Sequence, residues 1–321
     1  MKDYKVYLAP HIQEVTQILQ NALQSDSALL EEASLHILQS GGKRVRPMFV
    51  LLSGLMGDVT KQDALLKTSA SLELVHMASL VHDDYIDNSD KRRGHDAVHH
   101  AYGEAIAIKT GHFVLAEALH LIADINDEKF HQSFANTILQ VCYGELDQMN
   151  DRFVYPISMT TYLRRIKRKT AVLIQASCEL GARSTNCDER IIYHLKRFGY
   201  YVGMSFQIID DILDYISDEA TLGKPAGSDL LNGHITLPLM ITAKHDKDIH
   251  QMLIKISASE SISDEQLSVI IEKVRKYGIE ESKQISSLFA EKALQHLEQI
   301  PQNVNRDYLM AIHQKMLNRA F

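Results

Sequence analysis

Apolar residues recur with the 3.6-residue period of the α-helix along nearly the whole chain, and this pattern limits the possible folds most. The rhythm is rarely interrupted, because the 321 residues include only 6 prolines and 15 glycines. No segment alternates apolar and polar residues between turn signals, as the strands of a hairpin would. With 45% hydrophobic residues, the chain can bury a large core. The sequence therefore predicts an all-α protein, with ten or more helices in a single domain over residues 1–321.

The periodicity also predicts where the helices lie. One interruption follows the second helix, at the basic segment 41–47, and a longer loop is expected over residues 223–238, where glycine and proline recur. The helices are expected over residues 10–23, 28–39, 48–56, 61–87, 104–123, 128–149, 160–181 and 188–217, followed by several amphipathic helices.

The segment 61–87 ends in three aspartates, Asp83, Asp84 and Asp87. In a helix, Asp83 and Asp87 lie one turn apart on one face. Their charges repel each other and oppose the helix dipole near its C-terminus. A cation would remove both penalties, and Mg²⁺ typically takes one or two carboxylates together with a substrate phosphate. Taken alone, the cluster is also typical of a solvated helix face.

A second cluster repeats the same spacing, with Asp210, Asp211 and Asp214. Its neighbours are apolar, so these carboxylates interrupt a segment that otherwise reads as core. Burying a charge without a partner is costly. Two copies of the pattern therefore favour metal binding over a solvated face.

Basic residues are spread over several short segments instead of one patch. Arginine offers two parallel donors to phosphate oxygens, and glycine permits a close approach of the backbone. Together these segments are typical of polyphosphate binding. No nucleophile elbow, Walker loop or dinucleotide fingerprint accompanies them, which favours activation of a leaving group by charge neutralisation. The segments are Lys43, Arg44 and Arg46 after Gly41-Gly42; Arg92 and Arg93; Lys167, Arg168 and Lys169; and Lys224 after Gly223.

Composition excludes other classes of protein. The net charge of −7 and the isoelectric point of about 6.1 argue against a nucleic-acid-binding protein. Cys142, Cys178 and Cys187 form neither an even set nor a metal-binding spacing. The chain lacks a signal-peptide pattern and an apolar run of about 18 residues that could span a bilayer. We therefore expect a cytoplasmic protein without a transmembrane segment, which leaves transient membrane association open.

The order of these motifs resembles that of the all-trans polyprenyl diphosphate synthases over nearly the whole chain. The resemblance implies the isoprenoid synthase fold, a helical bundle around a central cavity. It also implies a Mg²⁺-dependent prenyltransferase. The matching motifs are Gly41-Gly42-Lys43-Arg44-Val45-Arg46-Pro47, Glu73-x-x-His76, Asp83-Asp84-x-x-Asp87, Arg92-Arg93-Gly94, Lys169-Thr170, Phe206-Gln207, Asp210-Asp211-x-x-Asp214 and Gly223-Lys224.

The resemblance assigns a role to each matching residue. Asp83 and Asp87 would bind two Mg²⁺ ions at the allylic diphosphate, and Asp210, supported by Asp214, would bind a third. Asp84 and Asp211 complete the catalytic motifs. The remaining expectations are that Arg92, Lys169 and Lys224 hold the allylic diphosphate, that Lys43, Arg46, His76 and Arg93 hold isopentenyl diphosphate, and that Thr170 and Gln207 face the allylic cation. Ionisation, attack by the isopentenyl double bond and proton loss to the departing diphosphate would follow.

Two histidines depart from the family pattern. His112 stands where aspartate is common, and we interpret it as a core histidine without a chemical role. His234 stands where lysine is common. Its charge depends on pH, so we leave it out of the site.

The length of the product is expected to depend on Ala78 and Ser79, which precede Asp83 on the same helix. Small residues there would let the growing chain pass. The most similar family members make heptaprenyl chains for menaquinone from farnesyl or longer diphosphates. They imply a small regulatory subunit as partner, a homodimer, or both. Geranylgeranyl, hexaprenyl or octaprenyl products stay open as alternatives.

Three other functions remain possible at this point. A class I terpene cyclase also uses an aspartate-rich helix and Mg²⁺, but it would leave segment 41–47 and Arg93 without a purpose. A non-catalytic helical partner subunit could have lost its aspartates, which this chain retains. A plain helical scaffold would bind neither Mg²⁺ nor diphosphate.

Overall fold

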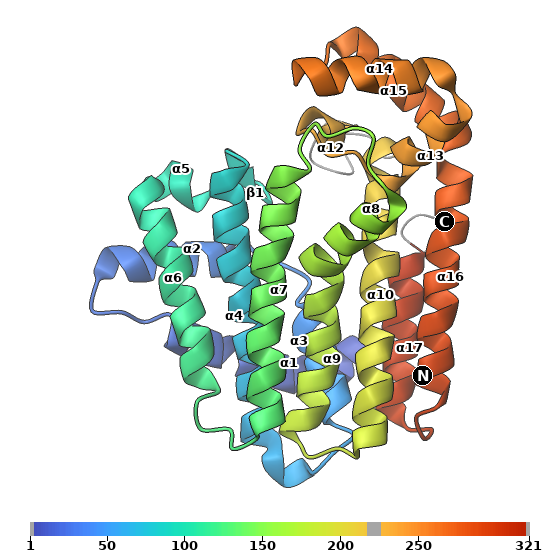
Figure 1. Cartoon of the computed structure of the whole chain (residues 1–321). Helices are drawn as coiled ribbons and strands as arrows, with labels where there is room; N and C mark the ends of the chain where they lie inside the picture. Colours follow the sequence, from blue (N-terminus) through green and yellow to red (C-terminus); the bar gives the residue numbers. More distant parts are fainter. Residues whose placement is uncertain (1–2, 217–225, 319–321) are drawn as a thin grey trace. The chain divides into compact units, whose positions relative to one another are not determined.

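Helices make up most of the protein, as the periodicity predicted. The computed structural model describes residues 3–216 and 226–318. Its helices (Figure 1) are α1 (Tyr4–Ala22), α2 (Ala28–Gln39), α3 (Val45–Gly54), α4 (Gln62–Ile86), α5 (Val98–Tyr102), α6 (Glu104–Leu121), α7 (Glu128–Asn150), α8 (Met159–Ile166), α9 (Val172–Ser184), α10 (Glu189–Ile216), α12 (Ser228–Leu231), α13 (Leu237–His245), α14 (Lys247–Ser259), α15 (Asp264–Tyr277), α16 (Ile279–Glu298) and α17 (Val304–Leu317), with a short 3₁₀ turn, η1 (Val59–Lys61), and a π-helical turn, η2 (Lys167–Ala171).

The chain divides into two compact units. Unit 1 comprises Met1–Leu139, Leu173–Gly199 and His296–Met310. Unit 2 comprises Gln140–Val172, Tyr200–Gln295 and Ala311–Phe321. The single domain over residues 1–321 stays a prediction.

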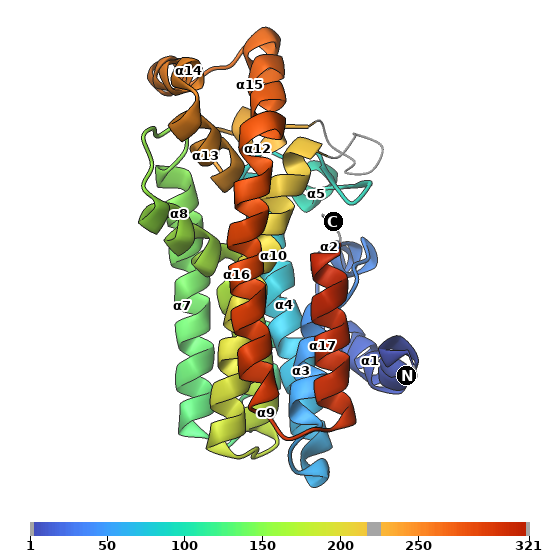
Figure 2. The ribbon, with the colours of Figure 1, turned by 90° about the vertical axis from the view of Figure 1, so that its right-hand side faces the viewer.

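Helix α4 forms the core of unit 1. It packs against α1, α3 and α6, and Figures 1 and 2 show α3 beside it. Its middle part is buried, with apolar residues such as Leu65, Leu72, Val75 and Val81 and the charged Glu73 in the interior. The first aspartate motif stands in the last turn. The apolar part of α4 therefore fixes the helix that carries this motif.

The core of unit 2 is built around the second half of α10. Ile208, Ile209 and Ile212 are completely buried there, packed with side chains of α8 and α13. A second cluster joins Tyr215 to α13, α14 and α15. Asp211 and Asp214 are also buried on this helix, so the second motif does interrupt a core helix, as predicted.

Two local features differ from the expectation. Strands β1 (Lys91–Arg92) and β2 (His95–Asp96) form a short antiparallel hairpin, although no strand was expected. Its turn is made by Arg93 and Gly94, which have φ angles of 52° and 86°. Positive φ at both central positions is typical of the tight turns that join two strands. Two-residue strands are too short for an alternating pattern to show in the sequence.

The expected helix over residues 160–181 is divided by η2 into α8 and α9. A π-helical turn inserts one extra residue and occurs frequently at functional sites. Here the turn contains Lys169 and Thr170, two of the predicted site residues.

Candidate active site

The first aspartate motif lies at the C-terminal end of α4, as its sequence predicted. Asp87 caps the helix, and its backbone N–H donates to the carbonyl of Asp83 at 2.8 Å. Asp84 points into the protein and is only 2% exposed. Both of its carboxylate oxygens accept from Arg92, one from Nε at 2.9 Å and the other from Nη2. Arg92 is therefore held by Asp84, whereas its predicted contact with the allylic diphosphate stays a prediction.

This pairing sets the electrostatics of the motif. Burial raises the pKa of Asp84 above its usual value, although Arg92 works in the opposite direction. Burial also acts to lower the pKa of Arg92, but the hydrogen bond to Asp84 and the charges of Asp84, Asp83 and Asp87 together outweigh it, so the pKa rises overall. Such a buried, doubly hydrogen-bonded pair fixes the β1 strand against the end of α4.

Asp83 shows that the motif suits a cation. Its Oδ1 is buried and makes no hydrogen bond within the described residues. A buried carboxylate oxygen without a donor costs about 1–3 kcal/mol, which a metal ion would remove. In the described part of the chain, no three His, Cys, Asp or Glu side chains gather into a metal-binding group by themselves.

The glycine-rich segment 41–47 reaches the turn of the β1–β2 hairpin. Gly42 has a φ of +152°, and a Cβ at this position would stand 2.6 Å from Nη1 of Arg93. Only glycine leaves room for this guanidinium. Arg44 and Arg93 also have positive φ values, of 48° and 52°. Strained backbone of this kind is typical of functional sites. The structure therefore brings together two motifs that the sequence assigned to isopentenyl diphosphate.

Four guanidinium groups surround His76 on α4. Burial and the charges of Arg46, Arg93, Arg92 and Arg44, in that order, hold the pKa of His76 well below its usual value. The imidazole is therefore neutral at pH 7. This concentration of positive charge beside a neutral ring is suited to an anion.

Arg44 has a structural role that the sequence did not reveal. Its Nη1 donates to Oε1 of the buried Glu73 at 2.7 Å, and its Nη2 donates to the carbonyl of Leu38 at 3.1 Å. The motif Glu73-x-x-His76 thus holds the basic loop through Glu73. No local pattern indicates this contact, because the two residues are 29 positions apart.

The two residues expected to limit product length lie one turn before Asp83. Ala78 is 3% exposed, and Ser79 is half-buried. The hydroxyl of Ser79 donates to the carbonyl of His76 at 2.8 Å, so it is satisfied by its own helix. Both side chains are small. Their role stays a prediction.

In unit 2, the π-helical turn meets α10. The hydroxyl of Thr170 donates to Oε1 of Gln207 at 2.5 Å, and Nε2 of Gln207 donates to Oδ1 of Asp211 at 2.9 Å. Lys169 donates to Oε1 of Gln148. The structure thus brings Lys169, Thr170, Gln207 and Asp211 into one region of unit 2. The roles expected of them stay predictions.

Three of these residues, Lys169, Gln207 and Asp211, border a cavity of about 80 Å³ in unit 2. Arg165 also borders it, and its Nη2 donates to the carbonyl of Ile235 at 2.5 Å. His234, which we left out of the site, lies on the wall of this cavity. Lys224 lies outside the described residues. The lining residues are Gln148, Arg165, Ile166, Lys169, Gln207, Asp211, Asp229, His234 and Thr236.

Asp214 has partners that the sequence did not predict. It is 1% exposed, and its two carboxylate oxygens accept from the hydroxyl of Ser228 at 2.7 Å and from the backbone N–H of Asp229 at 3.1 Å. Asp214 therefore orients the start of α12, whereas Asp210, one turn earlier, is only half-buried. The magnesium ligation expected of both residues stays a prediction.

The sequence as a whole decides the family. The sequence model of a protein family, described as polyprenyl synthetase, matches residues 27–274. The chain belongs to the polyprenyl synthetase family. It is similar to heptaprenyl diphosphate synthase component 2 from Bacillus subtilis (strain 168), with 45% identity over 316 residues that cover 98% of this chain and 90% of the relative.

Solved structures of this family have a similar fold. A heptaprenyl diphosphate synthase from Staphylococcus aureus has a TM-score of 0.92 and 42% identity, covering 98% of this chain and 99% of the other. A polyprenyl synthase from Caulobacter crescentus CB15, solved with calcium and isoprenyl diphosphate, has a TM-score of 0.92 and 29% identity. The match covers 99% of this chain and 97% of the other. The predicted all-α isoprenoid synthase fold is confirmed.

Membership also decides among the functional alternatives. The chain is a trans-prenyltransferase, and the non-catalytic partner subunit is not favoured.

Within the part of the chain that the structure describes, no helix is long and apolar enough to cross a membrane. One interpretation was wrong: His112 is exposed on α6, with its ring centroid 5.7 Å from that of His82, and so is not a core histidine. Its position falls on the outer side of α6, which the mixed pattern of that helix did not reveal.

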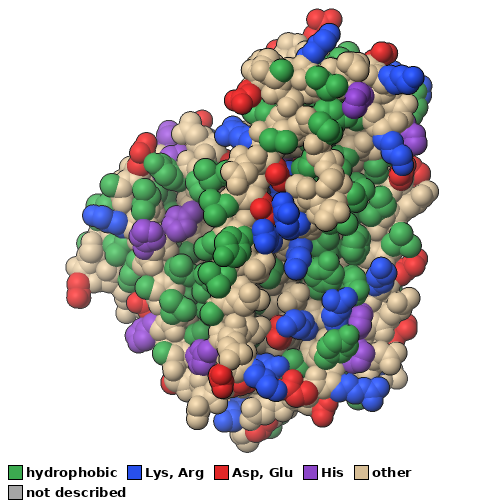
Figure 3. Space-filling model, in the orientation of Figure 1, with side chains coloured by type: hydrophobic (Ala, Val, Ile, Leu, Met, Phe, Trp, Pro, Cys, Tyr) green, Lys and Arg blue, Asp and Glu red, His purple; other side chains and the backbone are tan. Residues whose placement is uncertain are grey.

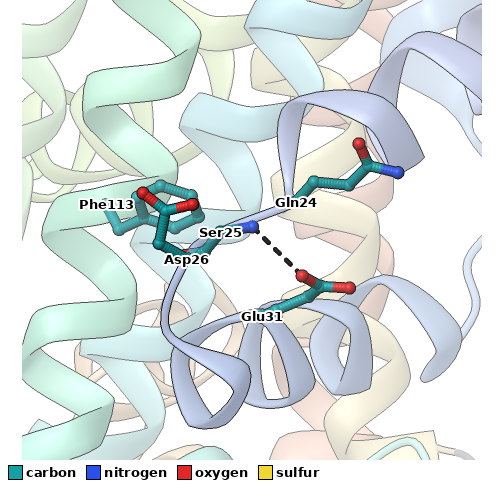
Figure 4. A pocket seen from close by; sticks show the side chains of 5 residues that line it. All are labelled: Gln24, Ser25, Asp26, Glu31 and Phe113. Carbon is teal, nitrogen blue, oxygen red and sulfur yellow. Dashed lines mark hydrogen bonds between the residues drawn. The ribbon is translucent and has the colours of Figure 1, made fainter.

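A larger hollow in unit 1 contains none of the predicted residues. It is open to solvent and measures about 580 Å³. Figure 4 shows its lining, with the backbone N–H of Ser25 donating to Glu31 at 3.1 Å and Asp26 beside Phe113. Its two carboxylates, Asp26 and Glu31, give it a charge that does not suit a diphosphate.

Proposed function

We propose that this family member condenses isopentenyl diphosphate with farnesyl diphosphate, or a longer allylic diphosphate, to give all-trans heptaprenyl diphosphate. One observation about α4 carries the proposal. Its last turns combine a buried carboxylate oxygen of Asp83 that has no donor with a neutral His76 surrounded by guanidinium groups. The first suits a divalent cation and the second an anion. A metal-dependent reaction between diphosphates uses both.

Different side chains would bind the two diphosphates. Arg93, Arg46, Lys43 and His76 would hold isopentenyl diphosphate, and Gly42 leaves the room in which the Arg93 guanidinium lies. Arg92, fixed by Asp84, and Lys169 would hold the allylic diphosphate, with Lys224 as a further ligand. Binding the two diphosphates places the isopentenyl double bond near the carbon that ionises.

The reaction then needs no protein nucleophile. The allylic C–O bond breaks, the isopentenyl double bond attacks the cation, and the departing diphosphate accepts the proton that is lost. Thr170 and Gln207 would stabilise the positive charge with their oxygen dipoles. This accounts for the absence of a dedicated base among the motifs.

We propose magnesium as the cofactor, with up to three ions. Asp83, Asp87 and Asp210, supported by Asp214, would supply the carboxylates. The bound metal would neutralise the charge that develops on the departing diphosphate.

Product length offers a direct test of Ala78. Replacing Ala78 by Phe should shorten the products, because a ring at this position would block the growing chain. Ser79→Phe should do the same. Chromatography of the products sizes them by the number of isoprene units.

A graded series serves as the control for this prediction. Ala78→Val and Ala78→Leu should shorten the products progressively less than Ala78→Phe does. Thermal unfolding should accompany each assay, since overpacking a buried site costs about 1–3 kcal/mol. Unchanged product lengths in a folded Phe variant would contradict the assignment.

The curated relative is named component 2, and we propose that this chain also works with a second, smaller component. Helix α7 supports this. One of its faces is buried through Val141 and Gln148, whereas Tyr143, Leu146 and Met149 on another face are 47%, 53% and 53% exposed. Figure 3 shows hydrophobic side chains along this helix. An apolar face with helical spacing suits a partner helix.

Leu146→Lys should weaken that association. A charge in the middle of an apolar helix interface is desolvated without a partner, so the dissociation constant should rise at least about tenfold. Analytical ultracentrifugation of the chain with its candidate small subunit would measure it. Glu145→Lys, on a neighbouring position of α7, is the charge control. Equal binding by the wild type and Leu146→Lys would exclude this face.

The deciding experiment for the function is a product assay. The purified chain, with and without the small component, is incubated with farnesyl diphosphate, isopentenyl diphosphate and Mg²⁺. Heptaprenyl diphosphate is the expected product, formed for a menaquinone side chain in the cytoplasm. Geranylgeranyl, hexaprenyl or octaprenyl diphosphate would correct the length alone, and no product under either condition would refute the proposal.

A further inference from the structure

A buried tyrosine of α8 joins the predicted residues of unit 2. Tyr162 is completely buried, and its hydroxyl donates to Oδ2 of Asp211 at 2.7 Å. The other oxygen of Asp211 accepts from Gln207, whose own oxygen accepts from Thr170. The four side chains form one continuous chain of hydrogen bonds through α8, α10 and η2. Tyr162 does not belong to any of the motifs.

The directions of these hydrogen bonds follow from the donors available. Both carboxylate oxygens of Asp211 accept a hydrogen bond here, so each needs a donor. Tyr162 supplies one, and the amide –NH₂ of Gln207 supplies the other. The amide oxygen must then face Thr170. The hydroxyl hydrogen of Thr170 is engaged by Gln207, which leaves the lone pairs of its oxygen to interact with a positive charge.

The consequence is a fixed polarity at Thr170. If Gln207 turned by 180°, its –NH₂ would face Thr170, and the Thr170 hydroxyl hydrogen could point elsewhere. Such a hydrogen repels a positive charge, whereas oxygen lone pairs attract it. Burial raises the pKa of Tyr162 well above its usual value, so its hydroxyl remains a donor throughout the physiological range.

We propose that Tyr162 is a positioning residue, which holds Asp211 so that Gln207 and Thr170 present oxygen lone pairs to the allylic cation. This inference rests on the proposed function, because the cation exists only in that reaction. It assigns Asp211 to orientation through Gln207, since both of its oxygens are already engaged within unit 2. A tyrosine that only fills the core would have no such effect on the reaction.

Tyr162→Phe removes the hydroxyl and little volume. We expect kcat to fall about 10–100-fold, as for other residues that orient a reactive group through a hydrogen bond. The KM values for both diphosphates should stay within about twofold, because no diphosphate ligand is removed. Tyr215→Phe is the matched control: Tyr215 is also completely buried in unit 2, but its hydroxyl lies near Thr236 and takes no part in the hydrogen bonds that join Asp211, Gln207 and Thr170. It should leave kcat unchanged.

A double-mutant cycle separates positioning from packing. If Tyr162 acts through Gln207, Tyr162→Phe should cause no further loss of kcat in a Gln207→Leu background. Losses that multiply in the double variant would overturn the inference, as would a kcat of Tyr162→Phe equal to that of the wild type. Gln207→Glu gives a second route that leaves Tyr162 in place: its carboxylate cannot donate to Asp211, so kcat should fall similarly, and normal turnover would overturn the inference.

Assay of the wild type distinguishes a failure of the proposed function from a failure of the inference about Tyr162. A wild type that makes no polyprenyl product refutes the proposed function and this inference with it. An active wild type whose Tyr162→Phe variant is equally active refutes the inference alone. Thermal unfolding of each variant identifies any loss of folded protein before the rates are compared.

Discussion

Asp83→Asn should abolish most of the activity without destabilising the protein. Asparagine keeps the shape of the side chain but loses the charge that a divalent cation needs. We expect kcat to fall at least about 10³-fold, the effect of removing a strong electrostatic contribution to the transition state. Incorporation of labelled isopentenyl diphosphate at saturating Mg²⁺ would measure it.

The stability of this variant distinguishes a metal ligand from a structural aspartate. In the wild type, Oδ1 of Asp83 is buried without a donor, and Asp84 and Asp87 lie beside it. Removing the charge relieves this repulsion, so the unfolding temperature should stay the same or rise. Asp90→Asn, an exposed aspartate just after α4, is the control and should retain activity. A large fall in stability together with activity would mean that Asp83 supports the fold instead.

Gly42→Ala should weaken the binding of isopentenyl diphosphate. The new Cβ would stand 2.6 Å from Nη1 of Arg93, so the guanidinium must move. We expect KM for isopentenyl diphosphate to rise about 10–100-fold, which corresponds to about 1.4–2.8 kcal/mol of binding energy. The KM for the allylic substrate should change little. Steady-state kinetics with each substrate varied in turn would show the difference.

The neighbouring glycine separates displacement from backbone strain. Gly41 also has a positive φ, of +80°, but its nearest contact from a Cβ is the carbonyl of Gln39 at 4.0 Å. Gly41→Ala therefore introduces strain without touching Arg93. If the two variants raise KM equally, backbone strain explains the effect and the contact with Arg93 does not.

Spacing was enough to predict the parts of the site that depend on neighbouring residues. The i, i+1, i+4 pattern placed Asp83 and Asp87 on one turn at the end of α4, and Asp210 and Asp214 one turn apart on α10. A helix has a fixed period, so residues four apart share a face whatever else the chain does. The apolar neighbours of the second motif likewise predicted that its helix belongs to the core.

Contacts between distant residues could not be predicted in this way. The role predicted for Arg92 gave no sign of its hydrogen bonds to Asp84. The role predicted for Asp214 gave no sign of the hydrogen bonds that it accepts from residues 228 and 229. Each side chain has several chemically suitable partners in the sequence. The choice among them depends on which segments the fold brings within hydrogen-bonding distance.

The sequence by itself determined the helical class, the two aspartate motifs and the family to which they belong. All of these follow from residue type and local spacing. Only the tertiary structure revealed Tyr162, the π-helical turn around Thr170, and the guanidinium of Arg93 against Gly42. A hydrogen bond or a steric contact acts over about 3 Å, and Tyr162 and Asp211 are 49 residues apart in the chain. Only packing of the helices brings such residues together, and packing decides which of their atoms face each other.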